Sequence, residues 1–123
     1  MKTRTELVHR ALSEMGRLYT GEAPSAEDYD AVNDLVEPLT DQLAADDVVY
    51  VGDLDQIEPA YFLSLGRLLA VTAAPSFGTD AIQTVLTRSR ADNMDALTER
   101  EQATLRRVSG SRPSYAPAAG VYY

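Results

Sequence analysis

One apolar segment organises this chain: Ala60-Tyr61-Phe62-Leu63-Ser64-Leu65-Gly66-Arg67-Leu68-Leu69-Ala70-Val71-Thr72-Ala73-Ala74. A helix that is apolar on almost every side is stable in water only when other helices surround it. We therefore expect residues 57–74 to form a central helix, with Gly66 allowing a close crossing and residues 75–78 ending the helix. The segment is too short to span a bilayer and carries Arg67 at its centre, so we expect no membrane span.

Two more helices are predicted before the central one. The first opens with a capping-box pattern at residues 3–6, and its apolar side chains recur at helical spacing as far as Tyr19. The second begins at Ser25, which precedes two acidic residues in the first turn. Pro38 lies inside the pattern of this second helix, so we expect a kink near Asp34.

A fourth helical segment begins at residues 79–80 and continues to Val108, and its polar middle, residues 89–93, predicts a break or a projection beyond the core. Residues 47–52 favour a short extended segment, which either packs as a loop on the helices or pairs with another chain. We expect it to pack. The predicted fold class is all-α: a compact bundle of about four helices with a short extended segment and an extended carboxy-terminal tail.

The composition fits one globular domain. The chain has 123 residues, of which 45% are hydrophobic and 24% charged, so wholesale disorder is not expected. It has no Cys and one His, which excludes a disulfide scaffold, a thiolate metal site, a Cys nucleophile and a His-rich metal centre. Residues 1–6 lack the apolar core of a secretory signal. We therefore expect a soluble protein of a reducing compartment.

The charges are segregated along the chain. The formal net charge is −8, and residues 18–66 contain twelve carboxylates and no Lys or Arg. This acidity argues against a free nucleic-acid binder. One interpretation is a solvated acidic surface, and the other is an acidic face that meets the basic flanks of a neighbouring copy. The candidate inter-subunit residues are Glu27, Asp28, Asp34, Asp46 and Asp47 on the acidic face, and Arg67, Arg88 and Arg90 as their basic partners.

No motif for catalysis or cofactor binding is present. The sequence has no Gly-rich phosphate loop, no Walker pattern and no nucleophile elbow. Residues 53–58 are acidic, but the glycine that a calcium loop requires is missing. His9 is interpreted as a structural histidine, and Glu14 as an exposed helix-face residue that pairs with Arg10 or Arg17. We therefore expect no enzymatic activity, no catalytic residue, no cofactor and no metal.

The composition changes abruptly at residue 109, which divides the chain into a helical body, residues 1–108, and an extended arm, residues 109–123. The arm contains no Leu, Ile, Phe, Asp or Glu, so it should be disordered alone. Because Arg and Tyr dominate interface hot spots and Pro lowers the entropy lost on docking, we interpret the arm as a docking device. The alternative is a flexible solubilising end. The candidate docking residues are Arg106, Arg107, Arg112, Pro113, Tyr115, Tyr122 and Tyr123.

Several short segments occur in a fixed order before the apolar helix. They are Glu6-Leu7-Val8 with Ala11-Leu12 and Gly16, then Gly21-Glu22-Ala23-Pro24-Ser25-Ala26-Glu27-Asp28, then Ala31-Val32-Asn33-Asp34-Leu35-Val36, and finally Ala44-Ala45-Asp46 leading into Val48-Val49-Tyr50. In this order the chain resembles the head-to-tail connector proteins of tailed bacteriophages, specifically the tail accessory or packaged-DNA stabilisation proteins of short-tailed phages. The resemblance covers about residues 5–105.

The resemblance implies a structural virion protein of the head–tail neck, assembled in the host cytoplasm. It implies a homo-oligomeric ring, expected to hold twelve copies, that lies beneath the portal, stabilises packaged DNA and provides the docking platform for the tail. The implied partners are the portal protein, neighbouring copies and tail or neck proteins. The arm would reach the portal, and genomic DNA would pass through the channel without specific binding. No cofactor and no membrane are implied.

Two other functions remain open at the level of sequence. One is a small bacterial α-helical regulator that binds a single protein partner as a monomer or dimer. The other is a cell-wall glycosidase, for which Glu14 would be the first carboxylate to replace. A measurement of molecular mass with and without portal rings separates the adaptor from the regulator.

Overall fold

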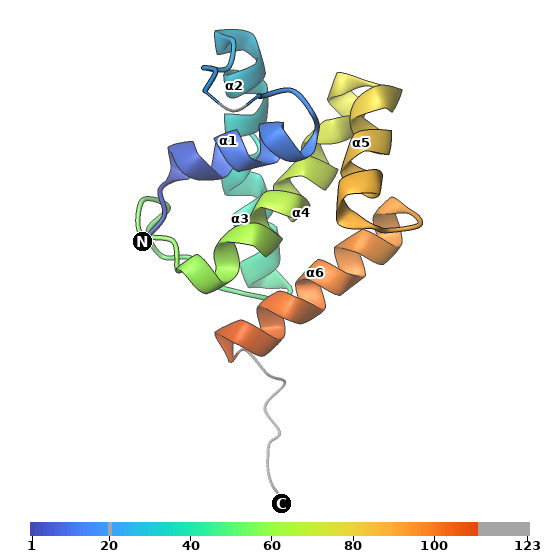
Figure 1. The fold of residues 1–123 in the computed structure, drawn as a ribbon. Helices are drawn as coiled ribbons and strands as arrows, with labels where there is room; N and C mark the ends of the chain where they lie inside the picture. Colours follow the sequence, from blue (N-terminus) through green and yellow to red (C-terminus); the bar gives the residue numbers. More distant parts are fainter. Residues whose placement is uncertain (20, 111–123) are drawn as a thin grey trace, which may run out of the picture.

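A computed structural model describes residues 1–19 and 21–110 and shows an all-α body, as the sequence predicts (Figure 1). The helices of this part of the chain are α1 (Arg4–Glu14), α2 (Ala26–Asn33), α3 (Val36–Ala45), α4 (Pro59–Phe77), α5 (Thr79–Ser89) and α6 (Met94–Ser109). The only β pairing among the described residues is an isolated bridge between Lys2 and Ile57, so the core is built by helix packing.

Helix α4 is the central helix, as its apolar sequence predicts. It lies between α1 and α6, with α5 packed against it (Figure 1), and its fully buried side chains include Leu65 and Leu69. Among the described helices, α4 is the one that is long and apolar enough to cross a membrane by length and composition alone, because with 19 residues it extends beyond the apolar run 60–74 at both ends. Of its apolar window, 44% is buried inside the body, and α4 packs against α1, α5 and α6.

Helix α4 also ends later than predicted. Pro75 lies inside its last turn, where the missing N–H removes one intrahelical hydrogen bond without stopping the helix. The helix continues to Phe77. It ends at Gly78, whose φ of 104° lies in a region that favours glycine. The turn to α5 is therefore set by the glycine and not by the proline.

Helix α1 begins as predicted and ends early. The Glu6 backbone N–H donates to the Thr3 hydroxyl at 3.2 Å, and the Thr3 N–H donates to the Glu6 carboxylate at 3.0 Å, which completes the capping box. The helix ends at Glu14, and Gly16 then has a φ of 73°. Tyr19, which the spacing places on the buried stripe, is exposed because the chain has already left the helix.

Both expected interruptions are breaks between helices. Residues 34–35 separate α2 from α3, and Pro38 lies in the first turn of α3, where its missing N–H costs no hydrogen bond. Residues 90–93 separate α5 from α6. Here Arg90 has a φ of 54°, and the Asn93 side chain caps α6 by accepting from a backbone N–H at 2.8 Å. The two breaks turn four predicted helical segments into six helices.

Residues 47–52 pack as a loop, as expected. Val48 and Val49 are buried, whereas Tyr50 is 77% exposed. The Ser109 hydroxyl donates to the Val48 carbonyl oxygen at 3.3 Å, so the loop is held against the end of α6. This contact belongs to a residue that the sequence division assigns to the arm.

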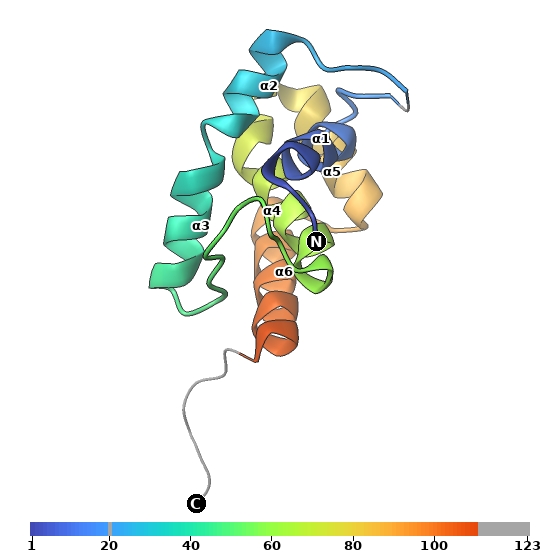
Figure 2. The same cartoon turned by 90° about the vertical axis from the view of Figure 1, so that its left-hand side faces the viewer.

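The helices separate two sides of the body. Helices α2 and α3 run end to end along one side (Figure 2). Helices α1, α4 and α6 form the side that faces the viewer in Figure 1, with α4 between the other two. The side occupied by α2 and α3 belongs to the part of the sequence that has no Lys or Arg.

Candidate protein-binding surfaces

The side formed by α2 and α3 is lined with carboxylates. We define the acidic edge as the exposed residues Glu27, Asp30, Asp34, Glu37, Asp41, Asp46 and Asp47. Glu37 pairs with Arg4 at 2.9 Å, and Asp46 accepts from a glutamine amide at 3.0 Å. The carboxylates of the other five make no ion pair or hydrogen bond within residues 1–19 and 21–110. Asp28, which the sequence assigns to the same face, is half-buried and pairs with Arg17 at 3.6 Å.

The predicted basic partners lie on different elements. Arg67, on α4, pairs with Glu101 at 3.5 Å. Arg88, on α5, donates to the Ser13 carbonyl oxygen at 2.7 Å and so satisfies an acceptor at the end of α1. Arg90 is exposed in the turn after α5 and has no partner within the described part of the chain. The three arginines therefore do not form one patch.

Two glutamates are buried beneath arginines. Glu14 is 5% exposed and pairs with Arg10 at 2.7 Å. The prediction that Glu14 is exposed is wrong because the core-facing stripe of α1 is wide enough to include it, whereas the predicted pairing with Arg10 is confirmed. Glu101 is 2% exposed and accepts from Arg100 Nε at 3.0 Å and from Arg67 Nη1 at 3.5 Å.

Sequence reasoning missed Glu101. It lies four residues after Leu97 and four before Leu105, both of which are fully buried, so it occupies the core-facing stripe of α6. A carboxylate in such a position needs a paired cation, because an isolated buried charge is strongly unfavourable. The signal was therefore a charged residue at a core position with an arginine directly beside it.

The paired arginines lie on the side formed by α1, α4 and α6. We define the arginine face as Arg10, Arg67, Arg100 and Arg107. The Arg10 side chain crosses α4 at Gly66, since a Cβ at position 66 would lie 2.8 Å from the Arg10 Cγ. Arg100 and Arg107 are seven residues apart and project from the same side of α6. Leu63, one turn before Arg67, is 49% exposed.

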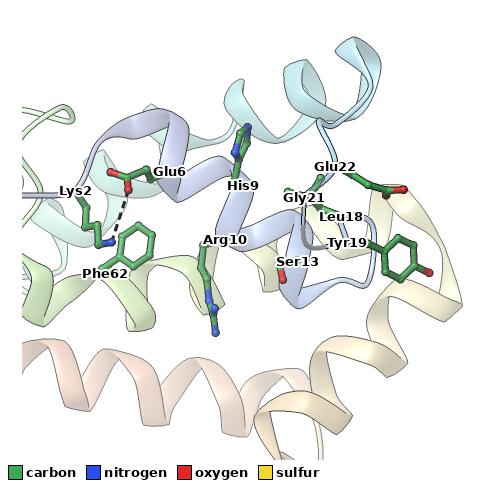
Figure 3. A pocket seen from close by; sticks show the side chains of 10 residues that line it. All are labelled: Lys2, Glu6, His9, Arg10, Ser13, Leu18, Tyr19, Gly21, Glu22 and Phe62. Carbon is green, nitrogen blue, oxygen red and sulfur yellow. Dashed lines mark ion pairs between the residues drawn. The ribbon is translucent and has the colours of Figure 1, made fainter.

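An open groove of about 380 Å³ follows α1 (Figure 3). At one end, Lys2 Nζ lies 5.1 Å from the centre of the Phe62 ring and 3.7 Å from the Glu6 carboxylate. His9 and Ser13 also line the groove, but they point away from each other and no hydrogen bond joins them (Figure 3). The groove therefore contains no Ser–His pair, and Lys2 is already paired within the chain.

The candidate residues His9 and Glu14 are each engaged with another side chain. His9 meets the Tyr29 ring edge-on with 6.0 Å between the centroids, which suits a structural histidine. Glu14, the first carboxylate to replace in a test for glycosidase activity, is buried and paired with Arg10. Within residues 1–19 and 21–110, no group of three or more His, Asp or Glu side chains is placed to hold a metal ion.

The start of the predicted arm belongs to the body. Helix α6 continues through Ser109 to a left-handed cap at Gly110. Arg106 donates to the Asp46 carbonyl oxygen at 3.3 Å, and Arg107 is exposed. The remaining predicted docking residues lie outside the described residues: Arg112, Pro113, Tyr115, Tyr122 and Tyr123.

Comparisons with known proteins gave no match: no family model, no curated protein and no solved structure matches this chain. The acidic edge, the arginine face and the arm are therefore the features from which a function can be inferred. Each offers charged or aromatic side chains of the kinds that bind other macromolecules.

Proposed function

We propose that the protein is a non-enzymatic structural adaptor of a bacteriophage head-to-tail connector, forming a ring beneath the portal. The observation that carries this proposal is the placement of the acidic edge and the arginine face on different sides of one helical body (Figures 1 and 2). Complementary patches on different sides of a subunit allow heterologous contacts, which close into rings when the rotation permits. Charge complementarity also fixes the register of such contacts.

The arm is the proposed portal-binding element. It offers Arg, Tyr and Pro, which suit a hot spot formed at low entropic cost. Arg107, at the end of α6, is exposed close to where the arm begins. Because residues 111–123 contain no Leu, Ile or Phe, the body should not depend on them for its core.

The net charge suits a protein that surrounds DNA without holding it. A formal charge of −8 repels the phosphate backbone, so genomic DNA would pass through the ring without adhering. The neighbours in the assembly would be other copies, the portal above and tail or neck proteins below. The proposed role needs no cofactor.

Binding to portal rings tests the proposal. Full-length protein is mixed with portal rings encoded by the same genome, and light scattering after size exclusion measures the mass of the complex. We expect a saturable complex with the full chain and none with a chain truncated after Gly110. A full chain that fails to bind the portal would contradict the adaptor function. A truncated chain that binds as tightly as the full chain would contradict the arm as the docking element.

A further inference from the structure

Three arginines of the arginine face form ion pairs with buried glutamates on their inner side and contact solvent on their outer side. The side chains of Arg10, Arg67 and Arg100 remain 37%, 30% and 44% exposed, whereas Glu14 and Glu101 beneath them are buried. Two buried carboxylates are thus shared among three arginines. The part of the cluster that meets solvent is cationic, and one positive charge is in excess.

Helix α6 extends this surface beyond the cluster. Arg107 is exposed on the same side as Arg100 and makes no ion pair or hydrogen bond within the described residues. Helices α4 and α6 run antiparallel (Figure 1), so Leu63, one turn before Arg67, lies beside the part of α6 that follows Glu101. Val108, in that part of α6, is also exposed. Exposed apolar side chains bordered by arginines are typical of protein interfaces.

The acidic edge has the complementary composition. Glu27, Asp30 and Asp34 are spaced three and four residues apart, so they follow one stripe along α2 and its end, and Asp41 is exposed on α3, which follows α2 end to end (Figure 2). These four carboxylates are exposed and unpaired within residues 1–19 and 21–110. They are therefore available to guanidinium groups of another molecule.

We propose that the arginine face of one copy binds the acidic edge of a second copy. The proposal rests on the proposed ring-forming function and names the contact within it. Guanidinium groups bind carboxylates in bidentate geometry, so four arginines can meet a stripe of carboxylates with defined register. The contact leaves the arginine face of the second copy free for a third, which allows the assembly to continue.

A second copy fits this face better than nucleic acid does. The chain as a whole carries a formal charge of −8, which disfavours binding to duplex DNA. Leu63 and Val108 offer apolar contact area, which a protein partner can cover and a phosphate backbone cannot. The carboxylates that would neutralise the face are present in unpaired form on the same chain.

Analytical ultracentrifugation of the full chain tests the contact. We expect self-association at about 0.01 M ionic strength that weakens strongly at about 1 M, because salt screens exposed charges. Arg107→Glu and Asp34→Arg should each weaken the association about tenfold, which corresponds to the loss of one good ion pair. An equimolar mixture of these two variants should recover it. Arg90→Glu makes the same charge change outside the face and should behave as the wild type. Circular dichroism establishes that each variant is folded.

Several outcomes would overturn this contact. A full chain that stays monomeric at both ionic strengths would do so, as would an Arg90→Glu variant that loses association as strongly as Arg107→Glu. Failure of the mixed variants to associate would also overturn it, and so would duplex DNA that binds the wild type and not Arg107→Glu. Because Arg107 borders the arm, portal binding is measured with Asp34→Arg. Self-association without portal binding refutes the adaptor function alone, and portal binding without self-association refutes this contact alone.

Discussion

Glu101 is the side chain whose surroundings differ most from those of an ordinary glutamate. It is 2% exposed between Leu97 and Leu105, and within residues 1–19 and 21–110 its carboxylate is paired with Arg67 and Arg100. Both arginine side chains are partly exposed, so in each ion pair only Glu101 is buried. The arginines are needed because, without them, the buried carboxylate would carry an uncompensated charge.

Glu101→Gln should lower the free energy of unfolding by about 1–2 kcal/mol, because it replaces the carboxylate by a neutral amide of similar size and so removes the ion pairs with Arg67 and Arg100. Urea denaturation measures the change. Glu99→Gln is the matched control, since Glu99 lies on the same helix, is exposed and has no ion pair within residues 1–19 and 21–110. Its change should stay within about 0.5 kcal/mol. Equal effects of the two substitutions would contradict the structural role of Glu101.

Glu6 makes the start of α1 sensitive to acid. The Thr3 backbone N–H donates to its carboxylate at 3.0 Å and, with a smaller contribution from Lys2, lowers the pKa of Glu6 below its ordinary value of 4.5. A carboxyl whose pKa is lower in the folded state stabilises the fold above its unfolded pKa, and this stabilisation is lost as the pH falls through the folded pKa.

Glu6→Gln should therefore lower the thermal midpoint at neutral pH, and its difference from the wild type should shrink as the pH falls below about 4.5. Thermal unfolding followed by circular dichroism across this pH range measures the difference. Glu99→Gln serves as the control, since Glu99 is exposed, lies away from the ends of α6 and is unpaired in the described part of the chain. A Glu6→Gln effect of constant size from neutral to acid pH would show that the capping carboxylate contributes no charge-dependent stability.

At the scale of elements, the crossing of α1 over α4 depends on a missing side chain. A Cβ at Gly66 would lie 2.8 Å from Arg10 Cγ and 3.4 Å from Arg10 Cβ. The near part of the Arg10 side chain cannot swing away freely, because its far end is held by Glu14 at 2.7 Å. The glycine that helix propensity disfavours is therefore the residue that lets Arg10 reach across α4.

Gly66→Ala should destabilise the protein by about 1–2 kcal/mol despite the better helix propensity of alanine, because Arg10 must move. In an Arg10→Ala background the same substitution should instead stabilise by up to about 1 kcal/mol, the propensity difference alone. A double-mutant cycle in urea isolates the coupling between the two positions. If Gly66→Ala costs the same in both backgrounds, Arg10 is not what requires the glycine.

The sequence predicts the element boundaries that depend on local chemistry. The cap at Ser25 and the break in the polar segment 89–93 each act on the backbone within one helical turn, and the structure confirms both. The kink expected near Asp34 is instead a break between α2 and α3. Features that depend on other elements were not predictable in this way. Glu14 is buried because its side of α1 packs into the body, which periodicity along one helix does not contain. Tyr19 is exposed because α1 ends at Glu14, earlier than the apolar spacing predicts.

At the scale of the whole molecule, one candidate surface was predictable from the sequence and the other depends on how the helices pack. The absence of basic residues over 18–66 predicts an acidic side, and α2 and α3 present one. The arginine face was not predictable, because Arg10, Arg67 and Arg100 are distant in sequence and meet only through the packing of α1 and α6 on α4. Arg88, assigned to subunit contacts from its charge, is instead engaged with the end of α1.

The boundary between body and arm can also be located at this scale. The composition changes at Ser109, yet its hydroxyl donates to the Val48 carbonyl oxygen at 3.3 Å, and Gly110 closes α6 with a φ of 73°. A left-handed glycine at this place satisfies carbonyl groups at the end of a helix. These contacts assign residues 109–110 to the body.

Truncation after Gly110 should therefore leave the free energy of unfolding within about 0.5 kcal/mol of the full chain, whereas truncation after Val108 should cost about 1–2 kcal/mol through the lost cap and hydrogen bond. Urea denaturation of both truncated chains measures this, and equal slopes with denaturant establish that the same body unfolds in each. Equal stability of the two truncated chains would place the boundary before Ser109. A large loss on truncation after Gly110 would mean that residues 111–123 stabilise the body itself. The binding of these residues to the portal would then have to compensate for the stability that the body loses.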